Sequence, residues 1–489
     1  MTRHSTPFFE GFSSLLFGRP ALSGLDTLLR RVQSLRSLSD FFETFGFLVP
    51  EALLEPRARG GHSRQRVYSL HVTFWAFLAQ VLVPQTPCRE IVRKVQAWWL
   101  QRNPTARPGS SSTCAYTKAR QRMGAEVLAP IANQLVEGLE RRVPSRHLWR
   151  SRRVRVVDGT TVSMPDTQEN QQRYPQSTSQ KPGCGFPLMK LVGLFSLASG
   201  ALLHLAKASL HVHESILLRS FLGLLEKDDI LLADRGFCSF NTFWQLSSQG
   251  VDTLMRLHQA RKTDFRQGKR LGPDERLITW RKSAARPSGC SPEDFASQPD
   301  TLTVRLVRLR VSARGHRTQT IWLVTTLLDP VAYPLASLGE LYLQRWSVEL
   351  HFREIKVTLG MDVLRCKSPD MVEKEVLMHA MAYNLIRALM QHAAIDHAVD
   401  LSRISFKGTA DTLRHWSASM ESLRGQPRKQ KALLQAMLRI IASDLVPLRP
   451  AREQPRARKR RPKNYPLLTQ PRHLFKFPTN RNHPKPSQS

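Results

Sequence analysis

Hydrophobic residues recur at helical spacing through the first part of the chain. The pattern runs through residues 25–48 and again through residues 127–143. Apolar positions that repeat every three to four residues indicate helices with one buried face. Residues 103–114, between the two, form a loop sequence rich in proline, glycine and serine. We therefore expect a helical amino-terminal module over residues 1–148, and its basic faces favour docking on DNA.

The pattern changes after residue 152, where short runs of β-branched and aliphatic residues alternate with helical segments. Such runs, bounded by turn residues, are typical of strands buried in a sheet. Strands are expected at residues 153–158, 190–197, 201–208, 229–234 and 251–258, and helices at residues 213–227 and 241–250. This order predicts a mixed sheet with helices packed on it, which is an α/β fold.

An inserted region at about 260–332 has the alternating pattern that is typical of β structure. Its three alternating runs are residues 277–282, 302–313 and 318–328. The middle run carries Arg305, Arg308 and Arg310, which we expect on one basic face exposed to solvent. Helices are predicted after the insertion, over residues 334–360 and 375–397.

These patterns divide the rest of the chain into three parts. Residues 149–400 form the predicted α/β core, and residues 401–448 a helical carboxy-terminal segment that is a candidate dimerisation surface. Residues 449–489 are rich in proline and basic, with a run of six arginines and lysines between positions 456 and 463. Such tails usually lack fixed structure and bind nucleic acid without reading its sequence.

Charge narrows the class of partner. The 489 residues include 73 lysines and arginines but only 39 acids, a formal net charge of +34. A protein this basic usually works against phosphate, although ribosomal, chromatin and membrane-surface proteins share the property. The six cysteines form no CxxC pair, so neither a zinc finger nor a disulfide framework is indicated. This fits a reducing cytoplasm.

No membrane segment is expected from the sequence. The most apolar run, residues 70–84, is shorter than a membrane span and carries His71, Thr73 and Gln80. It is typical of a buried helix instead. The first residues lack the apolar core and cleavage site of a secretory signal. We therefore expect a soluble protein.

Four polar residues share one stripe of the helix predicted after the insertion. Tyr342, Arg345, Glu349 and Lys356 follow the spacing Y-(2)-R-(3)-E-(6)-K. With Tyr342 at 0°, the others fall at about −60°, −20° and −40° on an ideal α-helix. A carboxylate flanked by cations and a phenol suits a helix that faces a polyanion and a metal ion. The alternative is an ordinary solvated charged face.

Two aspartates join that carboxylate as candidates for a metal site. Asp158 ends the first predicted strand and Asp234 ends the fourth. Because strand ends gather at one edge of an open α/β sheet, these residues should converge. Phosphoryl transfer uses two hard cations about 3.5–4 Å apart, and magnesium takes oxygen ligands. Taken singly, Asp158 could be a turn former, Asp234 a helix cap and Glu349 half of a surface ion pair.

A third cluster, His211, His213 and Glu214, has the residue types of a metal site but not the HExxH spacing. We expect it to start the helix that follows.

Together these residues resemble a known family. The segment DGTTV around Asp158, the segment LLADRGF around Asp234 and the ungapped Y-R-E-K signature are similar to those of DDE transposases of the insertion sequence four family. The resemblance covers roughly residues 65–400. It implies an RNase H-like catalytic core interrupted by a β insertion, and a cut-and-paste reaction on double-stranded DNA.

The resemblance also implies roles for single residues. Asp158, Asp234 and Glu349 would hold two Mg²⁺ ions, for which Mn²⁺ can substitute. A nick at the element's end would free a 3′-hydroxyl, which forms a hairpin by attacking the opposite strand and, after reopening, attacks target DNA. The resemblance implies a homodimer on DNA in the bacterial cytoplasm, at the nucleoid.

The remaining signature residues would then contact the DNA. The resemblance gives Tyr342, Arg345 and Lys356 the task of holding phosphates and terminal nucleotides near the cut. An aromatic residue of the insertion would stack on a flipped base, an interaction worth about 1–3 kcal/mol. Trp280 is the candidate and Trp322 the alternative, and a buried core tryptophan is an equally good interpretation of Trp280.

Three other functions remain open from the sequence: a non-catalytic DNA-binding regulator, an RNase H-like nuclease or resolvase without strand transfer, and a structural nucleic-acid protein. The three acids and the complete signature argue against the first and the third.

Overall fold

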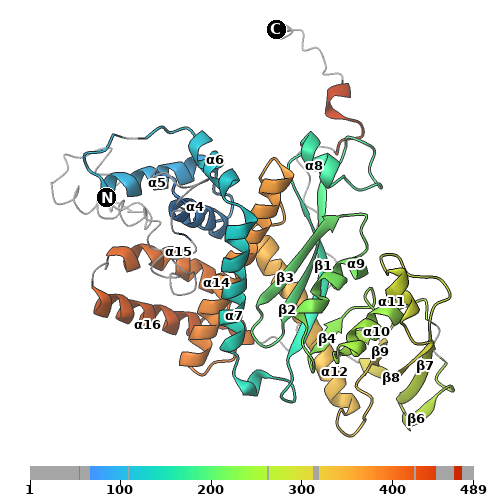
Figure 1. Ribbon diagram of the computed structural model, residues 1–489. Helices are drawn as coiled ribbons and strands as arrows, with labels where there is room; N and C mark the ends of the chain where they lie inside the picture. Colours follow the sequence, from blue (N-terminus) through green and yellow to red (C-terminus); the bar gives the residue numbers. More distant parts are fainter. Residues whose placement is uncertain are drawn as a thin grey trace, which may run out of the picture.

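The computed structural model describes residue 54 and residues 67–107, 109–261, 264–311, 319–422, 426–447 and 467–475. The helix predicted at residues 25–48 and the basic run at residues 456–463 lie outside the described residues. Figure 1 shows a central sheet with the amino- and carboxy-terminal helices on one side and the strands of the insertion at the far end.

The amino-terminal part is helical, as predicted. Its helices are α4 (Leu70–Leu82), α5 (Cys88–Arg102), α6 (Cys114–Arg122) and α7 (Ala125–Arg141). Nearly every side chain of α4 is buried, because this helix lies between its neighbours and the long helix α14 (Pro369–Asp396). Among the described residues, no helix has both the length and the hydrophobicity that crossing a membrane requires.

One mixed sheet forms the centre of the molecule. In the described residues its strand order is β3-β2-β1-β4-β5-β9-β8-β7-β6. The first five strands are β1 (Val154–Ser163), β2 (Leu188–Ser196), β3 (Leu202–Ser209), β4 (Ile230–Ala233) and β5 (Asp252–Arg256). The strands β1, β4 and β5 run parallel, while β2 pairs antiparallel with β1, and β3 pairs antiparallel with β2. This is the RNase H-like order, and it confirms the predicted α/β core.

Both faces of this sheet are buried, which explains why its strands have almost continuous apolar sequences. Side chains alternate along a strand, so Val156 packs into one hydrophobic cluster and Val157 into the other. The first cluster includes α4, α7 and α14, and the second lies under shorter helices. These shorter elements include α9 (Glu214–Leu218), the 3-10 segment Arg219–Leu224 and α10 (Phe240–Ser248). Two further short helices, α8 (Gln168–Arg173) and α11 (Pro292–Ala296), lie in other parts of the chain.

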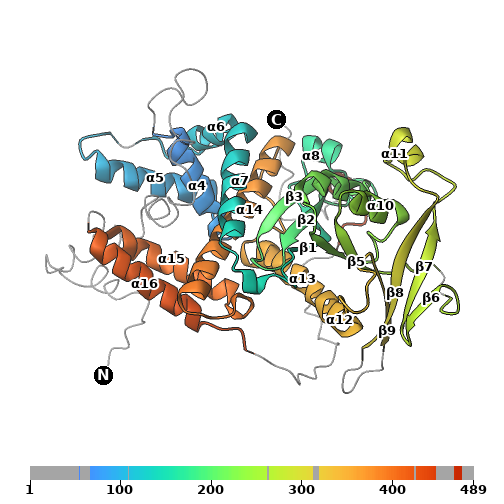
Figure 2. The same ribbon diagram turned by 60° about the horizontal axis from the view of Figure 1, so that its bottom comes forward.

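The insertion is mainly β, as predicted, and it extends the central sheet. Its strands are β6 (Lys269–Gly272), β7 (Glu275–Arg281), β8 (Thr301–Val311) and β9 (Gln319–Thr325). β9 pairs antiparallel with β5, so the insertion lies at the opposite end of the sheet from the helices α4–α7 (Figure 2). The insertion is therefore joined to β5 directly by the backbone hydrogen bonds of β9.

The predicted basic face of the insertion is wrong for one residue. Arg305 is 0% exposed, whereas the side chains of Arg308 and Arg310 are 28% and 64% exposed. The reason is the spacing: residues three apart in a strand point to opposite faces of the sheet. Arg305 therefore faces the core.

The single helix predicted over residues 334–360 is also wrong in detail. The chain is helical throughout but changes its winding three times. The pieces are α12 (Leu335–Leu343), the 3-10 segment Gln344–Trp346, α13 (Ser347–Arg353) and the π-helical segment Glu354–Thr358. Short π segments inside helices occur frequently at functional sites. After α14, the helices α15 (Phe406–Ser422) and α16 (Pro427–Ser443) pack against it and against each other.

Candidate active site

Asp158 lies within β1 and not at its end, which corrects the sequence prediction. β1 continues to Ser163, but its pairing with β4 stops at Val156. From Asp158 onward only β2 pairs with it, until Ser163 meets Val363. The carboxylate is therefore placed where β4 has ended and one side of β1 is uncovered.

Asp234 occupies the predicted place, one residue beyond β4. The backbone N–H of Gly236 donates to its Oδ1 at 2.8 Å, which fixes the turn that follows. Asp234 therefore makes the local hydrogen bond expected of a turn residue. The charge of Asp234 also acts on both Asp158 and Tyr342.

Two glycines let helices approach β1 and its partner closely. Gly193 pairs with Asp158, and a Cβ added there would lie 2.9 Å from the ring of Phe352 on α13. A Cβ on Gly159 would lie 2.4 Å from Oε1 of Glu214. Because α13 is seated this closely, Glu349 on the same helix comes within the electrostatic reach of Asp158.

Arg345 joins two of the three carboxylates. Its guanidinium lies 3.5 Å from Oδ2 of Asp158 and 3.1 Å from Oε1 of Glu349. Its side chain is only 13% exposed, and it stands 6.0 Å from the centre of the Tyr342 ring. Three of the four signature residues thus meet at the carboxylates, as their shared helical stripe predicted.

The pKa of Asp158 is raised to about 6, from an ordinary value of 3.8. Burial is the largest cause, and the charges of Asp234 and Glu349 add to it. A hydrogen bond from the backbone N–H of Gly159 and the charge of Arg345 act in the opposite direction. Burial of this carboxylate therefore outweighs the two interactions that stabilise its charge.

Lys356 contacts the strand and not the carboxylates. Its Nζ donates to Oγ1 of Thr160 at 3.1 Å and to the main-chain oxygen of Thr161 at 2.8 Å. Lys356 lies in the π-helical segment, and its partial burial lowers its pKa. A second cation therefore lies against β1, a few residues beyond Asp158.

The aromatic residues do not lie as the sequence predicted. Trp280 is 5% exposed and packs against Phe243, with Arg261 4.0 Å above its ring. The alternative, Trp322, is half-buried beside Phe265. The structure therefore brings neither tryptophan to an open surface.

A different tryptophan is exposed at the site. Trp346, next to Arg345, is 60% exposed. It belongs to a row of exposed apolar side chains, Leu343, Trp346, Leu350 and Val357, each of which directly follows a signature residue. This row can be recognised in the sequence. Adjacent residues of a helix lie about 100° apart on its surface, so residues that each follow a signature residue form a stripe of their own. A second apolar stripe beside the charged one is the pattern that was missed.

The histidine cluster starts a helix, as expected. The backbone N–H of Ser215 donates to Nδ1 of His213 at 3.2 Å, which caps α9. Among the described residues, no three acidic, histidine or cysteine side chains converge closely enough to hold one ion.

The three carboxylates nevertheless suit a hard cation in their chemistry. They offer only oxygen donors, as magnesium prefers, and the charges of Asp234 and Glu349 add to burial in raising the pKa of Asp158. The positive charge of Arg345 already stands between Asp158 and Glu349. Asp158, Asp234 and Glu349 are therefore the residues that would hold a divalent ion here.

Comparison with known proteins shows what the chain around this site is similar to. Residues 149–385 match the family described as Transposase DDE domain. The transposase InsG for insertion sequence element IS4, from Escherichia coli strain K12, is 25% identical over 451 residues, which span 90% of this chain and 96% of that protein. Residues 149–385 are therefore similar to DDE transposases, and nearly the whole chain is similar to a transposase of the IS4 element.

Two further likenesses accompany these. The putative transposase InsZ of Escherichia coli strain K12 is 29% identical over 176 residues, covering 35% of this chain and 57% of that protein. A solved synaptic complex of piggyBac transposase with hairpin DNA aligns with 85% of each chain at a TM-score of 0.40 and 10% identity, a remote likeness. These likenesses support an enzyme that acts on DNA, in a class that typically uses divalent metal ions.

Proposed function

We propose that this transposase cuts double-stranded DNA at the two ends of an insertion sequence and joins the freed ends to target DNA by cut-and-paste transfer. The observation that carries the proposal is that Arg345 bridges Asp158 and Glu349, with the charge of Asp234 also acting on Asp158. The formal charge of +34 on the chain supports a polyanionic substrate such as DNA.

The three carboxylates would hold the divalent cations, preferably two Mg²⁺ ions. When bound, such ions polarise phosphoryl oxygens and lower the pKa of an attacking hydroxyl. The chain's own cations complete the site. We propose that Arg345 turns from its two carboxylates to a DNA phosphate, since a guanidinium forks onto phosphate and carboxylate oxygens alike. It would then leave Asp158 and Glu349 free as ligands.

Lys356 would hold a second phosphate further along the same strand. Its present hydrogen-bond partners are a hydroxyl and a carbonyl oxygen, and neither of these is a carboxylate. Tyr342 is 7% exposed, and its ring packs beside the guanidinium of Arg345. We propose a hairpin intermediate, in which these cations hold the second strand while the 3′-hydroxyl attacks it.

Trp346 is the aromatic residue that we propose to meet the DNA bases. It is exposed beside Arg345, whereas Trp280 lies under Arg261. Base–aromatic stacking is worth about 1–3 kcal/mol, and only an open ring can provide it. Replacing Trp346 should therefore weaken hairpin formation more than replacing Trp280.

Paired cuts at two element ends imply at least two copies of the transposase on the DNA. We propose a homodimer, with residues 401–448 as the candidate surface. The helices α15 and α16 in this segment expose Ile440 and, just beyond them, Leu445 and Val446.

The deciding experiment uses purified protein and a labelled duplex that carries the element's own terminal repeat. Incubation with and without Mg²⁺ should give a metal-dependent nick at the repeat boundary and then a hairpin band on a denaturing gel. Tight, salt-sensitive binding without cleavage under Mg²⁺ or Mn²⁺ would instead indicate a non-catalytic regulator. Cleavage without joining to target DNA would indicate a nuclease.

A further inference from the structure

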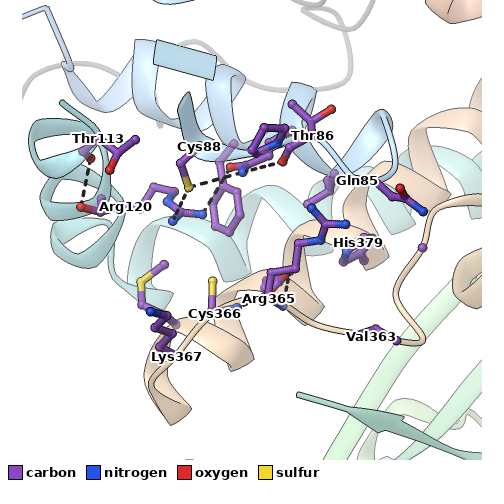
Figure 3. A pocket seen from close by; sticks show the side chains of 18 of the residues that line it. Gln85, Thr86, Cys88, Thr113, Arg120, Val363, Arg365, Cys366, Lys367 and His379 are labelled. Carbon is purple, nitrogen blue, oxygen red and sulfur yellow. Dashed lines mark hydrogen bonds between the residues drawn. The ribbon is translucent and has the colours of Figure 1, made fainter. Parts of the chain in front are cut away.

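A cavity of about 610 Å³ lies between the amino-terminal helices and the catalytic core. One wall comes from α4, the turn before α5, and α6. The opposite wall comes from residues 359–368 and the start of α14. Figure 3 shows Arg120 and Cys88 on the first wall, and Arg365, Cys366 and Lys367 on the second.

Arg120 is a buried cation at this cavity. It is 7% exposed, and its Nε has no hydrogen-bond partner. Its terminal nitrogens reach only Oε1 of Gln80 at 3.3 Å and the sulfur of Cys88 at 3.4 Å. Among the described residues, no carboxylate lies within ion-pair distance of it. A buried charge without an ionic partner is costly, so a ligand that brings negative charge would be favoured here.

The opposite wall adds positive charge. Arg365 and Lys367 are exposed at the cavity. The nearby carboxylate of Glu375 is occupied, because it accepts the backbone N–H groups of Arg365 at 3.0 Å and Cys366 at 2.9 Å. His379 is 4% exposed and its Nδ1 has no partner. The cavity thus offers three cations and an unused imidazole nitrogen, with one more acid, the exposed Glu169, at its edge.

This wall is tied to the catalytic strand. It begins directly after the segment that carries Lys356. The backbone N–H of Ser163 donates to the oxygen of Asp362 at 3.1 Å, and that of Leu364 donates to the oxygen of Ser163 at 2.8 Å. Oγ1 of Thr167 donates to the oxygen of Lys367 at 2.8 Å. A group held by the wall therefore has a fixed position relative to the end of β1.

We propose that this cavity is a second phosphate site, which receives a phosphodiester of the element's terminal DNA where the duplex passes from the amino-terminal helices to the core. The proposal rests on the function proposed above. The apolar residues Phe77 and Pro84 on the walls suit the deoxyribose that accompanies the phosphate. Such a contact positions the duplex but carries no sequence information.

The test uses the full chain without divalent cations, so that binding is separated from cleavage. The double variant Arg365→Gln with Lys367→Gln removes the two exposed cations and leaves Arg120, which packs on Phe77 and Tyr116. Arg146→Gln, an exposed arginine outside the cavity, is the matched control. Binding to a terminal-repeat duplex is measured by fluorescence anisotropy over a range of salt concentrations.

Wild type and control should show the same steep salt dependence. The double variant should bind about tenfold more weakly at moderate salt, with a slope of log K against log salt shallower by about 1. A scan with single neutral methylphosphonate linkages should find one position to which wild type is sensitive and the double variant is not. Unchanged slopes and an unchanged scan, in a protein that still cleaves with Mg²⁺, would overturn the cavity site alone.

The last measurement tests whether the cavity binds inorganic phosphate. Titration calorimetry that shows phosphate binding lost in the double variant, while DNA binding is unchanged, would also overturn the proposal, because the site would then serve a free anion. If wild type neither binds nor cleaves terminal DNA, both the proposed function and the cavity site are wrong. This outcome differs from the one above, in which the protein still cleaves and only the cavity site is wrong.

Discussion

Two arginines meet carboxylates in two parts of the same sheet, one in the insertion and one beside β1, and they do so in opposite ways. In the insertion, Arg305 is fully buried and donates from Nε to Glu275 at 2.8 Å. It also donates to three main-chain oxygens, those of Leu327, Asp329 and Tyr333. This guanidinium is saturated by groups of the protein.

Arg345 at the active site is not saturated. It has two carboxylate contacts, of which the one to Asp158 is long at 3.5 Å, and its side chain remains partly exposed. The comparison shows how to tell the roles of two buried arginines apart. A guanidinium whose donors are all used by the fold supports the fold, while one with donors to spare can exchange partners when DNA arrives.

The largest expected effect comes from removing the acids around Arg345. Asp158→Ala, Asp234→Ala or Glu349→Ala should each lower the rate of strand cleavage by more than about 10³-fold, because loss of a metal ligand costs several kcal/mol of transition-state stabilisation. Binding of the terminal duplex should persist. Cleavage is followed on denaturing gels and binding by anisotropy. Full cleavage by any one variant would remove that residue from the site.

The second prediction separates the two arginines by stability. Arg305→Ala should lower the free energy of unfolding by about 3–5 kcal/mol, because it leaves the carboxylate of Glu275 and three carbonyl oxygens without their donor. Arg345→Ala should cost less than about 1 kcal/mol, since it also relieves burial of the charge. Urea denaturation measures both. Equal losses would contradict the distinction between a saturated and an exchangeable arginine.

The third prediction concerns the order of the two cuts. Arg345→Ala and Lys356→Ala should slow hairpin formation about tenfold more than first-strand nicking, a difference of about 1.4 kcal/mol, because both cations are placed to hold the second strand. Single-turnover gels resolve the two products. Arg353→Ala, an exposed arginine on the same helix, is the matched control and should leave both rates unchanged. Equal slowing of both steps by Lys356→Ala would place this lysine in general DNA binding.

The strands were predictable because their chemistry is local. Val156 and Val157 face opposite cores, so the sequence there is apolar without a break. The polar second half of β1 was not predictable, since Gly159 to Ser163 is extended only because β2 and the segment after Lys356 pair with it. Such pairing depends on residues far away in the chain.

The sequence supplied candidate residues for the site but little of their geometry. The shared stripe of Arg345 and Glu349 follows from helical spacing, and the structure brings them together. The contact of Lys356 with Thr160 depends on the π-helical segment, for which the sequence has no clear signal. The exposure of Trp346 was not predicted, and the burial of Trp280 was one of two interpretations that the sequence left open, because both depend on which elements pack over each ring.

The smallest expected effect is a pH dependence of stability that comes from Asp158. Its folded-state pKa, about 6, lies above the ordinary value of 3.8. The protonated carboxyl is therefore favoured by folding, and this stabilisation is complete below pH about 4 and lost as the pH rises through about 6. Asp158→Asn cannot ionise, so its melting temperature should gain on that of wild type between pH 4.5 and 7.5, with pH-dependent contributions from the rest of the chain cancelling in the difference. Mg²⁺ at pH 7.5 should raise the melting temperature of wild type more than that of the variant, because binding to the folded state stabilises it. A difference that stays constant across the pH range would show that Arg345 already neutralises Asp158, and would leave Arg345 as firmly held as Arg305.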